Sequence, residues 1–430
     1  MKLNYAFLFT FLFVIICPRL IAEPPESGLS TREGSIRLTL EDCISQAKEN
    51  NLQLLQAKMD IDQARAGVTD ANSSYYPSLG LSSGYRYGGD FTEPGTGSFS
   101  TGINAQYTLY KGGSIRAGTK IAKTRVKIAE ENYRQKENEV VLSVKQAFFK
   151  ILQTQEQISL INNVLKRRNE NLTLIKLNYN VGRENEPDVK QAEVSLNQTE
   201  YDYMKAKQGL SLAKLGLNRL LNRSDEEIAI KYEDRVIEFP ELDSVAKMAK
   251  EERPEIISEK ANREVLQAQI SQAKSNYLPA VSVSSSYGYG LQGDTLLKQK
   301  ANWSAGINLS LPLFNGFSTS AKVRAATISL KQNDFNLLDL TNNIEQEVKQ
   351  AYSDWQLATK NLEVSSRTLE ATRAAYQLTK LQYEQGRTSY FFLQQKESDL
   401  TQAENGYVNS QYNLRASAAT LEKVLGRSSQ

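Results

Sequence analysis

The stretch VKQAFFKILQTQEQISLINNVLKRRNENLTLIKLNY, residues 144–179, decides how the rest of the chain is organised. Every seventh residue in it is apolar or aromatic: Val144, Ile151, Ile158, Leu165, Leu172 and Tyr179. The same ladder returns 204 residues later, at Val348, Trp355, Leu362, Leu369, Tyr376 and Tyr383. A seven-residue apolar repeat stays on one stripe only where helices supercoil around one another. Two ladders in the same phase therefore predict a tandem duplication built on long coiled-coil helices.

Each ladder belongs to a predicted helical hairpin. In the first half, the long helix is expected from Ser114 to Tyr179, where no proline interrupts the apolar pattern. Gly182 can take the left-handed conformation that ends a helix, so the chain is expected to turn there and return as a second helix. The second half repeats this plan, with its turn near Gly386.

Each hairpin is preceded by a shorter helix and two strands. We predict single helices over residues 40–73 and 242–276, each followed by a proline. Apolar residues then alternate with small or polar ones, which predicts β-hairpins over 78–110 and 280–312.

These elements predict three segments in the mature chain. The first repeat covers residues 23–221 and the second covers 241–430. A charged linker, 222–240, joins them, and Ile228 and Ile230 within it indicate one short strand.

The N-terminus predicts export. Lys2 precedes an apolar run that ends before Glu23, so we expect a signal peptide over residues 1–22. Cys17 follows a bulky isoleucine, whereas a lipid-attachment site has a small residue before the cysteine, so lipidation is not the favoured reading. Cys43 would be the only cysteine of the mature chain, and its helical pattern predicts a core position.

Composition argues against several classes of function. The 52 Lys and Arg residues nearly balance the 49 Asp and Glu residues, which gives no electrostatic footprint for nucleic acid. The chain has no histidine, which excludes histidine triads and histidine metal ligands, and one mature cysteine excludes thiolate clusters. We therefore predict no catalytic residues, no metal site and no cofactor.

The four predicted strands favour a membrane barrel shared by several chains. Each is about ten residues long, the length that a tilted strand needs to cross a bilayer. The alternative is two amphipathic hairpins on a soluble core, but a lone hairpin is marginal in water. Four strands cannot close a barrel, since about eight is the smallest number known, whereas three chains would supply about 12.

Several short motifs resemble those of the TolC-like outer-membrane efflux family. The opening Leu38-Thr39-Leu40-Glu41-Asp42-Cys43-Ile44 is similar to the start of such proteins, as are Tyr76-Pro77 and Leu278-Pro279 before each first strand. The exits from the strands, YTLYKGG at 107–113 and LSLPLFNG at 309–316, also resemble the family. So do the turns YNVG at 179–182 and YEQG at 383–386.

This resemblance implies a mainly α fold with a membrane β-barrel portion. Long antiparallel coiled-coil hairpins and four transmembrane strands per chain, tandemly duplicated, would assemble as a homotrimer. The trimer would form a barrel in the outer membrane and a helical tunnel through the periplasm. It would act as a passive duct for efflux or type I secretion, docked to a periplasmic adaptor and an inner-membrane transporter.

The resemblance also implies site residues at the two turns. The adaptor contacts would be Gly182, Arg183, Gly386 and Arg387. The candidates for the pore constriction are Tyr383, Thr388, Tyr179, Glu184 and Asp188.

The chain departs from the family pattern at the constriction. Two aspartates of the family align with Phe392 and Gln395, and its arginine aligns with Thr388. Closure is therefore expected to depend on packing and neutral hydrogen bonds around Tyr383, with Glu184 and Asp188 setting only a weak negative field. The alternative interpretation is that these charged side chains only lie exposed to solvent at the hairpin tip.

Two other classes of function fit the sequence less well than a duct. A structural or adhesive outer-membrane trimer, anchored by its barrel, would have helices running in one direction and strands at one terminus, unlike the plan above. An enzyme could use acidic pairs such as Glu130-Glu131, but these lie on polar helix faces without a pocket. The duct is the favoured function.

Overall fold

The computed structural model describes residues 36–89, 95–224, 227–232, 239–292 and 298–426. The predicted signal peptide, with Cys17, lies outside the described residues, as do residues 225–226 and 233–238 of the predicted linker. Within the described part of the chain, every helix is too short or too polar to cross a membrane.

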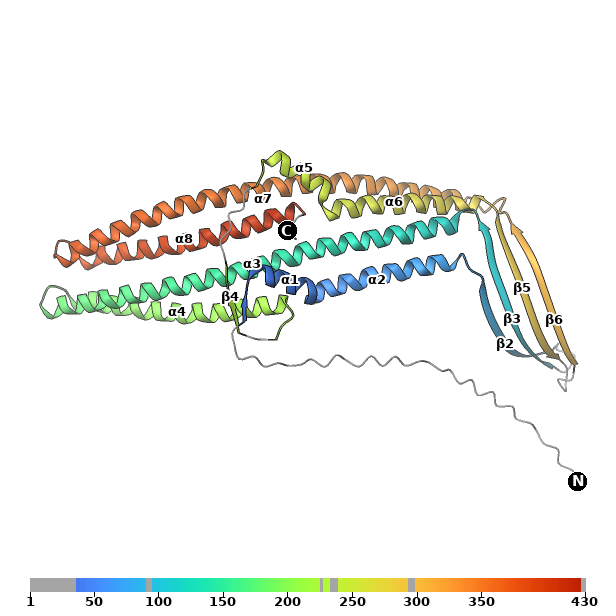
Figure 1. Cartoon of the computed structure of the whole chain (residues 1–430), viewed down its shortest axis with the longest axis horizontal. Helices are drawn as coiled ribbons and strands as arrows, with labels where there is room; N and C mark the ends of the chain where they lie inside the picture. Colours follow the sequence, from blue (N-terminus) through green and yellow to red (C-terminus); the bar gives the residue numbers. More distant parts are fainter. Residues whose placement is uncertain (1–35, 90–94, 225–226, 233–238, 293–297, 427–430) are drawn as a thin grey trace, which may run out of the picture. The chain divides into compact units, whose positions relative to one another are not determined.

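Two long helical hairpins form the framework (Figure 1). The first consists of α3 (Ser114–Asn180) and α4 (Glu186–Leu220), and the second of α7 (Ser318–Glu384) and α8 (Tyr390–Val424). The helices of each hairpin pack along one another, and α3 also packs against α8. The ladder residues Val144, Ile151 and Val348 are fully buried, so the predicted coiled-coil hairpins are confirmed.

Each of the helices before the strands is broken into two, unlike the single helices expected from the sequence. The first half has α1 (Leu40–Asn50) and α2 (Leu52–Ser73), and the second has α5 (Leu242–Glu252) and α6 (Pro254–Lys274), followed by a short 3-10 turn, Ser275–Tyr277. The single helices expected over 40–73 and 242–276 are therefore wrong.

The two breaks have local causes. Asn51 is extended, its side chain accepts hydrogen bonds from the amides of Gln53 and Leu54, and its Nδ2 donates to the Leu220 carbonyl at 2.8 Å. This cap starts a new helix. At the second break Pro254 occupies the first position of α6, and a residue before proline avoids the helical conformation, so Arg253 is extended.

The four long strands form one antiparallel sheet. The strands β2 (Ser78–Gly88), β3 (Thr96–Lys111), β5 (Ala280–Gln292) and β6 (Lys298–Ser310) are ordered β2-β3-β5-β6. The two predicted hairpins are thus confirmed, and β3 and β5 join them. The outer strands β2 and β6 each pair on one side only among the described strands.

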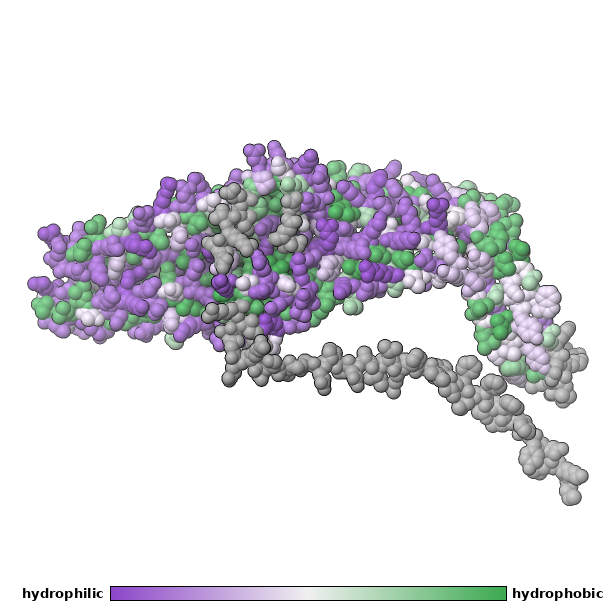
Figure 2. Space-filling view, viewed as in Figure 1, coloured by the Kyte–Doolittle hydropathy of each residue, from purple (hydrophilic) through white to green (hydrophobic). Residues whose placement is uncertain are grey.

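The two faces of this sheet differ in chemistry. Register pairs place the large apolar side chains on one face; they are Leu79, Leu81, Tyr85, Tyr87, Ile103, Tyr287, Trp303, Ile307 and Leu309. All nine are exposed in the single chain, Trp303 by 77%. The opposite face carries serine, glycine, asparagine and glutamine. Figure 2 shows hydrophobic residues gathered along the strands and where the strands meet the long helices.

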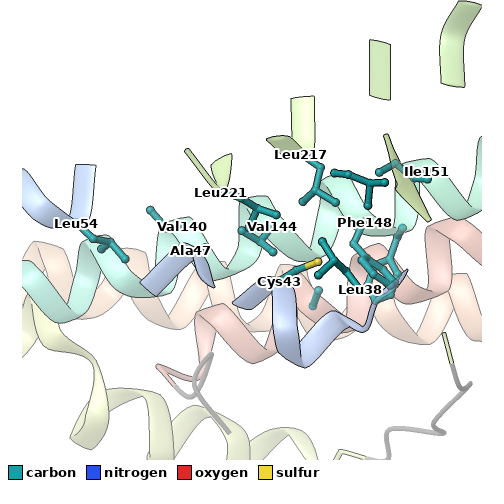
Figure 3. Close-up of a cluster of buried hydrophobic side chains, with 13 residues drawn as sticks. Leu38, Cys43, Ala47, Leu54, Val140, Val144, Phe148, Ile151, Leu217 and Leu221 are labelled. Atoms are coloured by element: carbon teal, nitrogen blue, oxygen red, sulfur yellow. The ribbon is translucent and has the colours of Figure 1, made fainter. Parts of the chain in front are cut away.

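A small parallel sheet and a hydrophobic cluster lie at the middle of the helices. The strands β1 (Ile36–Leu38) and β4 (Ile228–Ile230) pair in parallel, which confirms the short strand predicted in the linker. Leu38 and Ile228 pack with Cys43 of α1, Phe148 of α3 and Leu217 of α4 in one cluster (Figure 3). Cys43 is fully buried, as predicted, and burial raises the pKa of its thiol to about 12.

Candidate functional site at the hairpin tips

The two hairpin turns have the same backbone structure. Gly182 and Gly386 have positive φ angles of 77° and 70°. The amide of Gly182 donates to the Tyr179 carbonyl at 2.9 Å, and that of Arg183 donates to the Asn178 carbonyl at 2.8 Å. The second turn repeats both bonds with the same distances. This pair of bonds defines the Schellman motif, in which glycine occupies the left-handed position because it has no Cβ.

A substitution at the turn is expected to destabilise the hairpin. Gly386→Ala should cost about 1–2 kcal/mol, because alanine resists the left-handed conformation. Gly406→Ala is the matched control, since Gly406 lies inside α8 and an added Cβ would meet no atom within 4 Å. That change should add about 0.5–1 kcal/mol of stability. Thermal unfolding of the detergent-solubilised protein measures both; equal effects of the two variants would contradict this account of the turn.

Tyr383 links the two tips. Its side chain is 3% exposed, and it packs in a cluster with Leu172 and Ile175 of α3 and Val189 of α4. Its hydroxyl donates to Glu184 Oε1 at 2.9 Å and accepts from Asn178 Nδ2 at 3.3 Å. All five of these partners belong to the other hairpin or its turn, so Tyr383 connects the second hairpin to the first.

Burial shifts the ionisation of this pair. Desolvation raises the pKa of Glu184, while the hydrogen bond from Tyr383 opposes the rise and the nearby Asp188 adds to it. Desolvation also raises the pKa of Tyr383, so its hydroxyl remains a donor at physiological pH. The expectation that Glu184 contributes only a weak field was incomplete: it is the acceptor of the Tyr383 hydroxyl.

Of the other candidate residues, only Asp188 lies beside Glu184, and none of them bonds to Tyr383 among the described contacts. Asp188 lies in the first turn of α4, where Asn185 caps the helix and a carboxylate is favoured by the helix dipole. Arg183 and Arg387 are exposed, Thr388 is half-buried, and Tyr179 is 43% exposed. The structure thus joins Tyr383 with Glu184, and leaves the rest of the predicted set on the surface of the tips.

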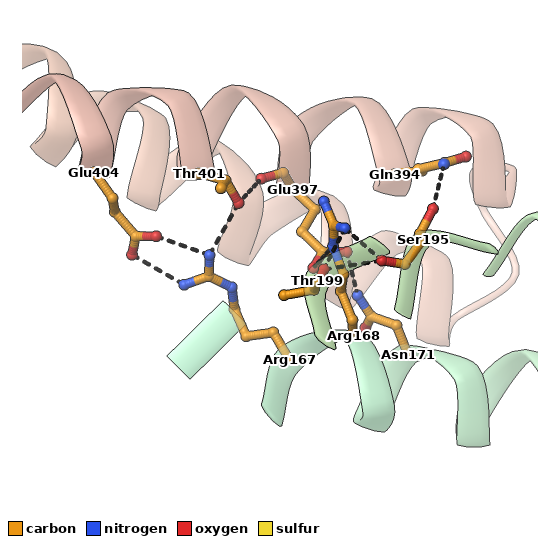
Figure 4. A network of polar contacts seen from close by, with 9 residues as sticks. All are labelled: Arg167, Arg168, Asn171, Ser195, Thr199, Gln394, Glu397, Thr401 and Glu404. Carbon is orange, nitrogen blue, oxygen red and sulfur yellow. Dashed lines mark hydrogen bonds and ion pairs between the residues drawn. The ribbon is translucent and has the colours of Figure 1, made fainter. Parts of the chain in front are cut away.

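A buried polar network lies farther along the same contact (Figure 4). We call the contact of α3 and α4 with α8 and the end of α7 the intrachain seam. Arg167 of α3 forms two hydrogen bonds with the Glu404 carboxylate of α8, at 2.9 and 2.8 Å. Asn171 Nδ2 donates to Glu397 Oε2 at 2.8 Å, and Arg168 Nε lies 3.7 Å from Glu397 Oε1.

Arg168 also ties α3 to α4. Its Nη1 donates to the Ser195 carbonyl at 2.6 Å and to Thr199 Oγ1 at 2.5 Å. A cavity of about 80 Å³ beside it is too small for a transported molecule. The network therefore fixes helices against one another and does not form a transport path.

This network was not predicted from the sequence, although the sequence contains a signal for it. Arg168 stands between the ladder residues Leu165 and Leu172, three and four positions away. Glu397 stands in the same way between Leu393 and Leu400 of α8. Residues at these spacings share one helix face, so opposite charges there indicate a buried ion pair across a helical seam.

Glu397 is expected to make hairpin packing depend on pH. The residue is 4% exposed, and desolvation raises its pKa above 4.5 despite Arg168, Asn171, Arg167 and Lys380. A carboxyl whose folded pKa is raised contributes stability that is full below its unfolded pKa and is lost as pH rises through its folded pKa.

The Glu397→Gln variant tests this dependence. Glutamine keeps an oxygen for Asn171 but cannot ionise, so the loss of heat stability on raising the pH above about 4.5 should shrink in the variant. Thermal melts of both proteins over a pH series measure it. Glu404→Gln is the control, because it removes a carboxyl of the same network that is paired with Arg167 instead of Arg168. An unchanged pH profile in Glu397→Gln would contradict the assignment.

The match to known proteins follows the same two halves. The family model described as outer membrane efflux protein matches residues 43–223 and 245–427. The chain belongs to this family. It is therefore an outer-membrane protein. The repeat limits 23–221 and 241–430 and the linker 222–240 remain predictions.

Individual relatives are distant in sequence but similar over nearly the whole chain. The chain is 22% identical to outer membrane protein TolC of Vibrio cholerae, over 91% of each chain. It is 23% identical to cation efflux system protein CusC of Escherichia coli O157:H7, covering 89% of this chain and 85% of that one. The open MtrE outer membrane channel of Neisseria gonorrhoeae superposes with a TM-score of 0.75 at 22% identity, covering 91% and 90%. These likenesses agree with the fold built above.

Proposed function

We propose that this outer membrane efflux protein is a homotrimeric duct that passively conducts substrates out of the cell. The observation that carries the proposal is the four-stranded sheet with one apolar, exposed face and two open edges, β2 and β6. Lipid does not tolerate unpaired backbone groups, so these edges must pair with strands of other copies. Three copies supply about 12 strands, enough to close a barrel.

The helical hairpins would continue the barrel as a tunnel. We propose that their tips, with Gly182, Arg183, Gly386 and Arg387, contact a periplasmic adaptor that joins the duct to an inner-membrane transporter. The transporter would supply the energy, so the chain itself would carry out no chemical step. One relative is a cation efflux system protein, which supports a place in such an efflux assembly.

Two measurements on one preparation test the duct. The mass of the detergent complex should correspond to three chains, because the barrel cannot close with one. The same complex should give single-channel currents in planar lipid bilayers. A structural or adhesive trimer is the alternative: it predicts three chains without current. A stable single chain would contradict both functions.

A further inference from the structure

The polar face of the four-stranded sheet carries an exposed arginine near one end. Arg86 has an even number in β2, whereas Tyr85 and Tyr87 of the apolar face have odd numbers, so Arg86 belongs to the polar face. Its side chain is exposed, and the structure assigns it no ion pair among the residues that it describes. An added Cβ at Gly84 or Gly88, the neighbours of Arg86 on this face of β2, would meet no atom within 4 Å. A guanidinium that stays charged at any physiological pH therefore lies on an open polar surface.

The middle of this face is uncharged. We call the residues that pair with one another across the strands a rung. On β2, β3 and β5, the four rungs that follow the Arg86 rung toward the helices carry only serine, glycine, asparagine and glutamine on the polar face. Lys111, at the opposite end of β3, pairs with Ala280. The sequence also has lysine at positions 298 and 300 of β6, whose backbones pair with residues 292 and 290 at the Arg86 end.

The Arg86 end corresponds to the outer mouth of the proposed barrel. β2 begins at Ser78, soon after α2, and ends at Gly88, whereas β3 leads back into α3. Arg86 therefore lies at the end of the strands that is away from the helices. In a membrane barrel the apolar face contacts lipid and the polar face lines the lumen. Symmetry would place the copies of Arg86 at one height around that lumen.

We propose that the three copies of Arg86 form a basic ring at the outer mouth of the lumen, which attracts anions and favours the exit of anionic substrates over cationic ones. The inference rests on the proposed homotrimeric duct and deepens it, because it names a residue that selects substrates and the charge that it favours. Clefts lined by charges of one sign raise the local concentration of ions of the opposite sign. The neutral rungs below the ring would leave this preference uncancelled along the barrel wall.

The range of the ring depends on salt. A barrel of about 12 strands has a backbone radius of about 12 Å, given a strand spacing of about 4.8 Å and a tilt of about 40°. Salt screens charges over about 10 Å at 0.1 M and over about 3 Å at 1 M. The ring should thus enrich anions near the wall and, more weakly, at the axis at 0.1 M salt. At 1 M salt its effect should disappear.

A cysteine beside the ring tests the local potential without any current through the duct. Ser100→Cys places a thiol on the exposed polar face, on the rung of Gly84, next to the rung of Arg86. Its reaction rates with an anionic and a cationic methanethiosulfonate, the ethylsulfonate and ethyltrimethylammonium reagents, are measured on detergent trimers. Arg86→Gln should lower the ratio of anionic to cationic rates about twofold at 0.1 M salt, and Arg86→Glu should lower it about fivefold. Arg86→Lys should keep the parent ratio, and all differences should vanish at 1 M salt.

Ser284→Cys is the matched control. Ser284 is exposed on the same face, four rungs from Arg86, which is about 27 Å along the strands. At 0.1 M salt its rate ratio should be the same with arginine or glutamine at position 86. The chain without an added cysteine gives the background, to which the fully buried Cys43 should contribute little.

The outcomes separate this inference from the proposed function. An unchanged ratio at Ser100→Cys in both Arg86→Gln and Arg86→Glu would show that Arg86 is only a solvated side chain. If that sample has a mass of three chains and conducts, the inference is wrong while the duct stands. An equal fall at Ser284→Cys, or a fall that persists at 1 M salt, would also overturn the ring. A detergent mass of one chain would contradict both proposals.

Discussion

The Tyr383→Ala variant is expected to open the channel. Tyr383 is buried between the two hairpin tips, and removing a buried aromatic side chain costs about 3–5 kcal/mol of packing. Many of the lost contacts join the second hairpin to the first, although the ring also packs near Tyr390 of its own hairpin, so the closed arrangement of the tips should lose a large part of that stabilisation. In planar lipid bilayers the variant should show larger conductance and a higher open probability than the parent.

The contribution of Tyr383 to closure can be divided between its ring and its hydroxyl. Tyr383→Phe keeps the ring but loses the hydrogen bond to Glu184. A hydrogen bond to a charged group contributes about 1.5–3 kcal/mol of stability. The variant should therefore shift the balance of closed and open states by about tenfold or more, with less effect than alanine. Asp188→Asn should change cation preference only mildly.

Tyr179→Ala is the matched control. It occupies the same position in the first hairpin but is 43% exposed in the single chain, where the structure assigns it no bond to the opposite hairpin. Its effect on conductance should be smaller than that of Tyr383→Ala. Should Tyr179→Ala open the channel while Tyr383→Ala has no effect, closure would depend on the contact between copies and not on the one within a chain.

The Arg168→Ala variant is expected to weaken the whole intrachain seam. It removes the bonds to Ser195 and Thr199 and leaves the Glu397 carboxylate, 4% exposed, without its nearest cation. Breaking a buried pair by removing one partner typically costs about 3–5 kcal/mol. The thermal transition of the solubilised protein should fall accordingly.

A double variant separates lost packing from the unpaired charge. Arg168→Ala with Glu397→Gln removes both charges, so the cost of burying an unpaired carboxylate disappears. The double variant should regain much of the stability that Arg168→Ala loses, although the bonds from Arg168 to α4 remain absent. If the double variant is less stable than Arg168→Ala, the carboxylate stabilises the seam without Arg168 and this explanation is wrong.

The long elements could be predicted because their patterns are long. A heptad ladder over 36 residues, present twice, indicates a helix and no other element. Strict alternation over about ten residues indicates a strand. The breaks at Asn51 and Arg253 escaped prediction because one residue causes each. Pro254 was a usable signal, since the residue before proline avoids the helical conformation. Asn51 was not, because its Nδ2 bond to Leu220 depends on chain packing.

The site was predictable in part. The ladder placed Tyr383 on a buried stripe, and the structure buries it. Periodicity along one helix cannot say which groups of another helix it meets, so Glu184 was not recognised as its acceptor. Tyr179 shares the ladder position but not the burial, because the two hairpins have different neighbours within one chain. The network around Arg168 and Glu397 joins residues more than two hundred positions apart, which only the packing of the hairpins brings together.

The pairing of β1 with β4 sets an order for folding during export. Residues 36–38 need residues 228–230 as their partner, and nearly all of the first repeat lies between them. A chain that crosses the inner membrane from its N-terminus must therefore hold β1 unpaired until the first helical hairpin has emerged. Once β4 has emerged, it can pair with β1 beside Leu38, Cys43 and Phe148, whereas Ala419 of α8 joins this cluster only after the second repeat follows. The first repeat would thus begin to fold before the second, and the pairing of β1 with β4 would set when it does so.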